Sequence, residues 1–431
     1  MHKYILILKK ISLNSSLVLA GVAISLFLCN CVLGFLSFPS EVPQKISHPI
    51  NYEEVRQNKE FQYIFKTNSR GLRYHDIPAE KPANTFRVFV SGDSFTEGEG
   101  VDDGKRFTDL LEGKFQSSDK SVLFINGGLT GAGPLMYGKL FLEVGLEYKP
   151  DALFICLFVN DVADTPEKLY LKPFSFLHSR SGLKKITQTL WPRVYTQLAL
   201  FYLQSEHHRK TKTTNFILTI SELARKKNIP QSQINRWKES LPQKLVTAVN
   251  QGTFNGSILS LGLLYPEYWS DSIDISNTRA KKKWENMTNI LSEILERAKQ
   301  SGVETAVILI PSTFQYDPKS HSETNPWIIT GSEIRKEWLS EETEIQKSMK
   351  LWTLSEGVSF LDLTPVFREA IKSNKNLNWE LDGHWNHLGH EVAANAIASW
   401  LDDQQVFSFM KSKNLRNLRT PSILFGTEFD K

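Results

Sequence analysis

Short apolar runs alternate with helix-like stretches over most of the chain. Five runs predict buried strands, at Thr85–Val90, Val122–Ile125, Ala152–Phe158, Glu304–Ile310 and Val358–Leu363. Apolar residues recur at helical spacing in other segments, at Phe107–Phe115, Leu135–Glu147, Lys281–Gln300, Ile334–Glu356 and Glu391–Leu401. This alternation predicts an α/β fold of flavodoxin-like type, with three α/β/α layers and a five-stranded parallel sheet in the middle.

The alternation stops after the third predicted strand. Residues 162–278 contain helical patterns, such as Asn215–Lys227 and Tyr195–His207, but no strong strand pattern. We therefore predict a helical insertion that leaves from and returns to one edge of the sheet, as a cap would. Its aromatic residues would form a small core of its own or line a substrate groove; they include Trp191, Tyr195, Phe201, Tyr202, Tyr265, Tyr268 and Trp269.

The N-terminal segment has the pattern of a membrane anchor. Three lysines precede Ser16–Leu36, a run of 21 residues without charge, which is long enough to span a bilayer as a helix. The positive-inside rule then places the rest of the chain outside the cytoplasm, in the periplasm or at the cell surface. A cleaved signal peptide is the alternative, but no Ala-x-Ala-like cleavage site is clear.

These patterns divide the chain into four parts. An N-terminal stub and anchor (1–37) is followed by an extended polar linker (38–84), and a tail (402–431) ends the chain. The α/β domain lies between them at 85–401 and contains the insertion.

Composition excludes several kinds of partner and site. The formal net charge is only +4 over 431 residues, and no basic stripe suggests nucleic-acid binding. The three cysteines form no disulfide framework, and no Cys/His spacing resembles a zinc site. We expect neither a metal ion nor another cofactor.

Polar residues with chemical potential follow the predicted strands. Ser94 comes after the first strand, the glycine-rich segment 126–134 after the second, Asn160 after the third, and Asp382 with His384 after the fifth. Because all five strands are parallel in this prediction, these loops meet at one edge of the sheet, where open α/β folds bind ligands.

The residue types match the needs of acyl transfer. Ser94 supplies a hydroxyl nucleophile, His384 a base to take its proton, and Asp382 a group to orient the imidazole. The backbone amides of Ser94 and Gly131, with the side-chain amide of Asn160, could donate to an oxyanion. Gly131 suits this task because it has no Cβ to block close approach.

Plainer interpretations exist for several of these residues. Asn160 could belong to an ordinary strand-end turn, and the glycines could merely shape a loop. His387 and His390 are better explained as packing or capping residues than as catalytic ones. Glu97 and Glu99 are expected to be solvated.

Four short motifs together resemble the SGNH, or GDSL-type, hydrolase superfamily. They are Gly92-Asp93-Ser94-Phe95, Asn126–Gly131, Asn160-Asp161 and Asp382-Gly383-His384. The resemblance implies that Ser94 is the nucleophile, that Gly131 and Asn160 serve the oxyanion, and that Asp382 and His384 complete a triad.

Two positions depart from the pattern of that family. Phe158 stands where the third motif usually has glycine, and the last motif reads Asp-x-His instead of Asp-x-x-His. The shorter spacing resembles SGNH-like proteins that acetylate exported polysaccharides.

Three functions are therefore compared. The first is a membrane-anchored, extracytoplasmic esterase that cleaves acyl or acetyl esters of carbohydrate or lipid. The second is an O-acyltransferase that modifies an exported polysaccharide, which would need a membrane partner as acyl donor. The third is a non-catalytic binding module of the same fold, and the complete set of site residues argues against it.

Overall fold

The computed structural model describes two parts of the chain. One comprises residue 18 and residues 21–35, and the other residues 47–404 except 79, 116–120, 168–189, 192, 195–214, 252–253, 255 and 374. The chain divides into two compact units, one of Met1–Lys45 with Phe174–Thr213 and one of Ile46–Pro173 with Thr214–Lys431. The sheet and the candidate site belong to the second unit.

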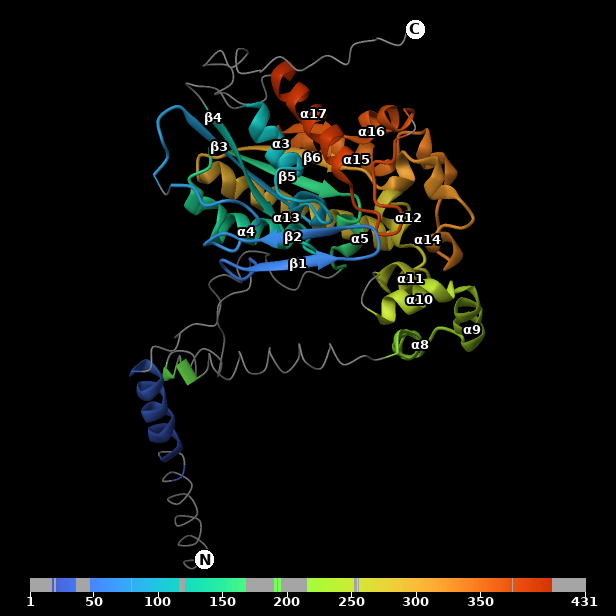
Figure 1. Ribbon diagram of the computed structural model, residues 1–431, viewed down its shortest axis with the longest axis horizontal. Helices are drawn as coiled ribbons and strands as arrows, with labels where there is room; N and C mark the ends of the chain where they lie inside the picture. Colours follow the sequence, from blue (N-terminus) through green and yellow to red (C-terminus); the bar gives the residue numbers. More distant parts are fainter. Residues whose placement is uncertain are drawn as a thin grey trace, which may run out of the picture. The chain divides into compact units, whose positions relative to one another are not determined.

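A five-stranded parallel sheet forms the centre of the second unit (Figure 1). Its strands are β3 (Thr85–Gly92), β4 (Ser121–Gly128), β5 (Ala152–Phe158), β6 (Glu304–Ile310) and β7 (Ser359–Asp362). The order β4-β3-β5-β6-β7, with every neighbouring pair parallel, is the flavodoxin-like order. Every residue of β5 is buried, as expected for a strand with helices over both faces. The predicted sheet is confirmed.

Helices cover both faces of this sheet (Figure 1). On one face α3 (Phe107–Lys114) contacts α17 (His387–Gln404), and on the other α4 (Pro134–Glu143) contacts α13 (Thr278–Gln300). Between β6 and β7 the chain forms α15 (Glu344–Glu356), and after β7 it forms α16 (Thr364–Ile371). Local signals explain where α15 begins and ends: Thr343 and Gln346 form a capping box, and Gly357 takes a left-handed conformation after the last turn.

The described part of the insertion is helical, as predicted. After α5 (Asp161–Asp164) come α8 (Phe216–Lys226), α9 (Gln231–Ser240), α10 (Gln243–Asn250), α11 (Gly256–Leu264) and α12 (Tyr268–Ile273). Ile220, Ala224, Ile234, Trp237 and Leu263 form a small core among these helices. α11 packs on α14 (Pro326–Ile329), and α12 packs on α5 and α13. The helix expected at 195–207 lies outside the described residues.

An antiparallel hairpin precedes the sheet in the chain. Its strands are β1 (Glu53–Gln57) and β2 (Gln62–Lys66). Tyr63 and Phe65 alternate with exposed neighbours and are buried against the domain. Arg73, which follows the hairpin, is fully buried and donates to the carbonyls of Gly98 and Val101. The extended linker expected here thus contains ordered structure that the sequence pattern did not reveal.

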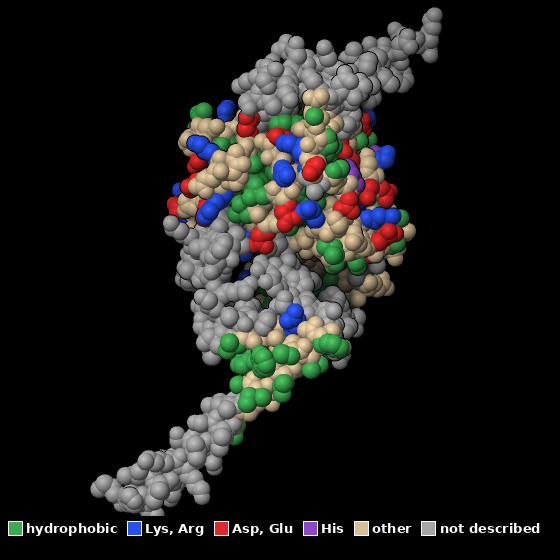
Figure 2. Space-filling view, turned by 90° about the vertical axis from the view of Figure 1, so that its left-hand side faces the viewer, with side chains coloured by type: hydrophobic (Ala, Val, Ile, Leu, Met, Phe, Trp, Pro, Cys, Tyr) green, Lys and Arg blue, Asp and Glu red, His purple; other side chains and the backbone are tan. Residues whose placement is uncertain are grey.

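Near the N-terminus, residues 21–35 form a helix. Its exposed apolar side chains, seen as the hydrophobic cluster near the lower end of Figure 2, include Val22, Ile24, Phe27, Leu28, Val32 and Phe35. Within the described ranges, no helix combines the length and apolarity that a membrane crossing needs. The predicted span Ser16–Leu36 extends beyond those ranges, so the anchor stays a prediction.

Candidate active site

Ser94 lies at the sharp turn between β3 and the four-residue helix α2 (Ser94–Glu97). Asp93 caps this helix, since its carboxylate accepts a hydrogen bond from the Phe95 amide at 3.0 Å. The end of β4 lies directly against α2: a Cβ on Gly128, the last residue of the strand, would approach the Glu97 amide nitrogen to 2.1 Å. Glycine at this position therefore lets the strand end and α2 approach closely.

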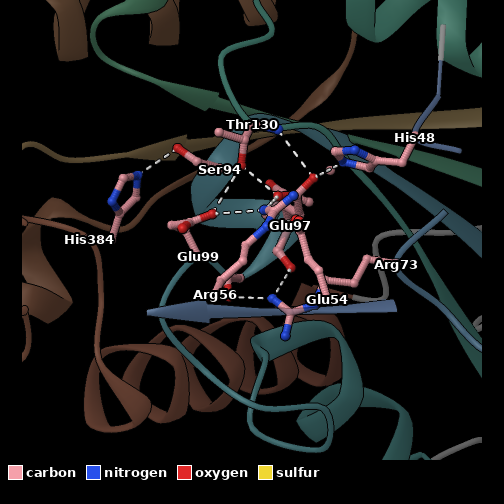
Figure 3. Close-up of polar contacts among 12 residues, drawn as sticks. His48, Glu54, Arg56, Arg73, Ser94, Glu97, Glu99, Thr130 and His384 are labelled. Atoms are coloured by element: carbon pink, nitrogen blue, oxygen red, sulfur yellow. Dashed lines mark hydrogen bonds and ion pairs between the residues drawn. The ribbon is translucent and has the colours of Figure 1, made fainter. Parts of the chain in front are cut away.

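His384 faces Ser94 from the far end of the domain sequence (Figure 3). Its Nε2 lies 2.6 Å from the Ser94 Oγ, and its Nδ1 lies 2.5 Å from Asp382 Oδ1. Trp385, the next residue, is fully buried and stacks on Phe367 with ring centroids 4.7 Å apart, which anchors the segment. The structure thus brings the predicted nucleophile, base and acid into one hydrogen-bonded chain.

The short Asp-x-His spacing is explained by the residue between the two side chains. Gly383 has a φ of +88°, a left-handed conformation that turns the chain and places the Asp382 carboxylate on the imidazole of His384. One detail of the prediction is wrong: these residues do not directly follow the last strand, because α16 intervenes between β7 and Asp382.

The electrostatics of this chain favour a charged imidazole. Burial lowers the pKa of His384, but the charge and hydrogen bond of Asp382 outweigh burial and raise the pKa to about 9. Burial likewise raises the pKa of Asp382, and the attraction of His384 brings it below its ordinary value. Asp93 is different, since burial raises its pKa to about 7 although His384 opposes the change. Asp382 is therefore the stronger partner of the imidazole.

Ser94, Gly131 and Asn160 border one cavity of about 300 Å³ together with Asp382 and His384. The predicted oxyanion donors therefore lie around the same space as the hydroxyl and imidazole. The backbone conformation gives a further reason for glycine at position 131. A Cβ there would meet no protein atom within 4 Å, whereas its φ of +73° disfavours other residues.

The other walls of this cavity are mainly apolar. The insertion contributes Ile258 and Leu261 from α11 and Trp269 from α12. Phe158, at the position where the resemblance implies glycine, packs on Phe95 with ring centroids 4.4 Å apart. The insertion thus lines the cavity beside Ser94, as predicted for a cap.

Glu60 is part of the site environment, and no sequence motif pointed to it. It lies in the turn of the β1–β2 hairpin, and its carboxylate accepts from the backbone N–H groups of Leu381 at 2.9 Å and Asp382 at 2.7 Å. The hairpin thereby holds the segment that carries Asp382 and His384. No local pattern could reveal a contact between residues 321 positions apart.

Glu97 lies in a charged network beneath Ser94 (Figure 3). It is fully buried and pairs with His48 and Arg56 of the N-terminal segment. It also accepts from the Thr130 hydroxyl at 2.5 Å and from the Thr130 amide at 3.3 Å. The expectation that Glu97 is solvated is wrong, because hairpin and loop cover it. Since Thr130 precedes Gly131, this network links α2, which begins at Ser94, to the loop after β4.

The remaining candidates have structural roles. Asn126 is buried and donates to the Thr96 carbonyl at 2.7 Å, which fastens α2 to β4. His390 is buried and its Nδ1 accepts from the Phe107 amide at 3.2 Å, as expected for a packing residue. His387 is exposed at the start of α17. No group of three potential metal ligands occurs in the described part of the chain.

Comparisons with known proteins give matches among solved structures. A scan against models of protein families and a search of curated sequences give none. A G-D-S-L-family lipolytic protein from Desulfitobacterium hafniense is 11% identical, with 73% of this chain and 98% of that chain covered and a TM-score of 0.33.

Two further structures are similar to the chain. An acetylxylan esterase from Geobacillus stearothermophilus is 12% identical, with 77% and 100% covered and a TM-score of 0.36. A lipase/acylhydrolase from Enterococcus faecalis is 11% identical, with 73% and 95% covered and a TM-score of 0.31.

Proposed function

We propose that this protein is an SGNH-type serine esterase that cleaves acyl or acetyl esters. The observation that carries the proposal is the hydrogen-bonded chain from Ser94 through His384 to Asp382, at the edge of a cavity that Gly131 and Asn160 also border. A nucleophile, base, orienting acid and oxyanion donors in one place are what acyl transfer needs.

The reaction would proceed in two halves. Ser94 Oγ attacks the ester carbonyl carbon while His384 Nε2 takes its proton, and the carbonyl oxygen becomes an oxyanion that Gly131 and Asn160 stabilise. The C–O bond to the alcohol then breaks, and His384 returns the proton to the leaving oxygen. In the second half, water activated by His384 attacks the acyl-serine and releases the acid.

Two further parts of the proposal concern where the protein is located and whether water or a sugar hydroxyl accepts the acyl group. Lysines 3, 9 and 10 before an uncharged run of 21 residues support a single-pass anchor with the domain outside the cytoplasm. The Asp382-Gly383-His384 spacing supports the alternative that a sugar hydroxyl replaces water in the second half. That O-acyltransferase would depend on a membrane partner for its acyl groups. The substrate would be an ester-bearing carbohydrate or lipid.

A serine-directed fluorophosphonate probe tests the chemistry. We expect it to label Ser94 and to leave Ser94→Ala unlabelled, with hydrolysis of p-nitrophenyl acetate lost in the same variant. His384→Ala should behave like Ser94→Ala, and His387→Ala serves as the control that retains activity. A folded wild-type protein that neither reacts with the probe nor cleaves the ester would instead be a binding module.

Two further experiments test the finer parts. Product analysis with an added oligosaccharide distinguishes hydrolysis from transfer, because only a transferase yields an acylated sugar. Cell fractionation tests the anchor: a soluble protein whose N-terminus begins beyond Leu33 would show cleavage.

A further inference from the structure

A second cavity, of about 550 Å³, adjoins the one beside Ser94. The two cavities share Thr313 and Gly383 in their walls. Two loops form most of the second cavity: one follows β6 and reaches Pro326, and the other leads from Asn376 to Gly383. We call this space the polar groove.

The position of the polar groove indicates which half of an ester substrate it would contact. His384 must pass a proton to the leaving alcohol oxygen, so the alcohol half of the ester lies on the His384 side of the reacting carbon. Gly383, directly before this histidine, lines the polar groove. The aromatic and aliphatic residues of the cavity beside Ser94, among them Phe158 and Trp269, suit an acyl group.

We propose, on the basis of the esterase function above, that the polar groove binds the alcohol half of the ester and that this half is a neutral oligosaccharide. The groove thereby becomes a subsite for the sugar, and the apolar cavity beside Ser94 becomes the subsite for the acyl group. The substrate class is an O-acylated glycan instead of a lipid ester.

The chemistry of the groove walls supports a sugar. Amides and hydroxyls from Thr324, Asn325 and Asn376 line it, and sugars are recognised by such hydrogen-bonding groups. Lys319 Nζ donates to Asn376 Oδ1 at 2.9 Å, which holds these two polar side chains together in the groove wall. Trp379 offers an apolar surface of the kind that packs on the C–H faces of sugar rings.

The charge of the groove argues against other ligands. Its wall carries the acidic residues Asp317 and Glu380 and one lysine, Lys319. This near balance gives no concentration of positive charge for a polyanion. A fatty-acyl chain would instead have to cover the hydroxyls and amides of the wall, which costs free energy when they lose their hydrogen bonds to water.

The test compares two esters on the wild-type full chain and on one double variant. In Lys319→Ala/Asn376→Ala, two groove side chains are removed, and both are exposed, so the fold should persist. Lys372→Ala is the matched control, because Lys372 is an exposed lysine paired with Glu369 outside the groove. The esters are p-nitrophenyl acetate, whose alcohol half is not a sugar, and mono-O-acetylated tetrasaccharides with glucose or N-acetylglucosamine backbones.

We expect the double variant to raise KM for an acetylated tetrasaccharide about ten-fold, as the loss of two hydrogen-bonding groups predicts. Cleavage of p-nitrophenyl acetate should stay within about two-fold of wild type. Equal effects on both esters, or none on either, would overturn the proposal while the esterase function stands. A preference for octanoyl glycerol that the double variant removes would also overturn it, in favour of lipid.

A binding measurement decides the case in which no ester is cleaved. Ser94→Ala protein is titrated with the free tetrasaccharides, and tryptophan fluorescence is followed, since Trp379 lines the groove. Saturable binding that Lys319→Ala/Asn376→Ala abolishes would support the sugar subsite even though the esterase function had failed. No binding at millimolar concentration would overturn the subsite as well.

Discussion

Replacing Glu60 by alanine is expected to slow ester cleavage without unfolding the protein. The Glu60 carboxylate accepts from the N–H groups of Leu381 and Asp382, at 2.9 and 2.7 Å. A hydrogen bond to an ionised group contributes about 1.5–3 kcal/mol. Glu60 is only partly buried, so the lower figure applies, and water can replace part of what is lost. We therefore expect a loss of about 1–2 kcal/mol in the free energy of unfolding.

The effect on catalysis should be larger than the effect on stability. Without Glu60 the Asp382–His384 turn is held at fewer points, and a shift of about 1 Å in a catalytic group can cost about 100-fold in rate. We expect kcat on p-nitrophenyl acetate to fall about 10–100-fold, with KM nearly unchanged. The rate of fluorophosphonate labelling of Ser94 should fall in parallel, because it depends on the same base.

Glu60→Gln should recover most of this loss. One side-chain oxygen, Oε2, accepts from both backbone N–H groups, and a glutamine oxygen can take the same place. Burial raises the pKa of Glu60, although its two backbone donors lower it. The negative charge is therefore not favoured at this position, and a neutral oxygen acceptor should serve nearly as well. Glu53→Ala is the control, because Glu53 lies in the same hairpin but pairs with Lys66 at the surface. If Glu60→Ala changed unfolding and left kcat and labelling at the control level, Glu60 would be structural only.

Three further predictions follow from the site. Because the pKa of His384 is raised to about 9 and the base must be deprotonated, kcat/KM on p-nitrophenyl acetate should rise with pH toward about 9; Asp382→Asn should shift this midpoint toward neutral pH, and a profile flat from pH 6 to 10 would contradict the assignment of the base. Asn160→Ala should lower kcat about 10²–10³-fold, and a change confined to KM would indicate substrate positioning instead. Glu97→Gln should lower the free energy of unfolding in urea by about 2–3 kcal/mol at pH 7, less than a wholly buried pair would lose because His48 and Arg56 are partly exposed. Since its partners hold the pKa of Glu97 below the ordinary value, this difference should shrink as the pH falls below about 4, and a constant difference would refute the pairing.

Local sequence patterns were sufficient to predict the sheet and to bring the main candidate residues to one edge of it. A short run such as Ala152–Phe158, which is apolar at every position, is typical of a strand that is covered on both faces. Once the strands are parallel, the residues after them must meet at one edge, which is why Ser94, Asn160 and Gly131 could be placed together.

Contacts between distant segments were beyond the reach of those patterns. Glu97 follows Ser94 in a glycine-rich segment and resembles a solvated acid. It is buried with His48, which precedes the hairpin, and Arg56, which lies in β1. Four of the five residues of β1 are polar, and Val55 is the exception, so its sequence resembles a linker. The left-handed conformation of Gly383 could not be predicted either, because the residue type alone does not determine the backbone angles.

The hairpin has a consequence for the design of shorter fragments of this protein. The four motifs begin near Arg87, and a recombinant fragment designed around them would start at Thr85 and retain the whole sheet. Such a fragment would lack Glu60 and His48, which support the Asp382 turn and the Glu97 network. Without the hairpin, the apolar surface beneath Tyr63 and Phe65 would be exposed to water, which promotes aggregation. Where such a fragment still folded, we expect it to cleave esters slowly. A fragment meant to test activity should therefore include His48 and the hairpin.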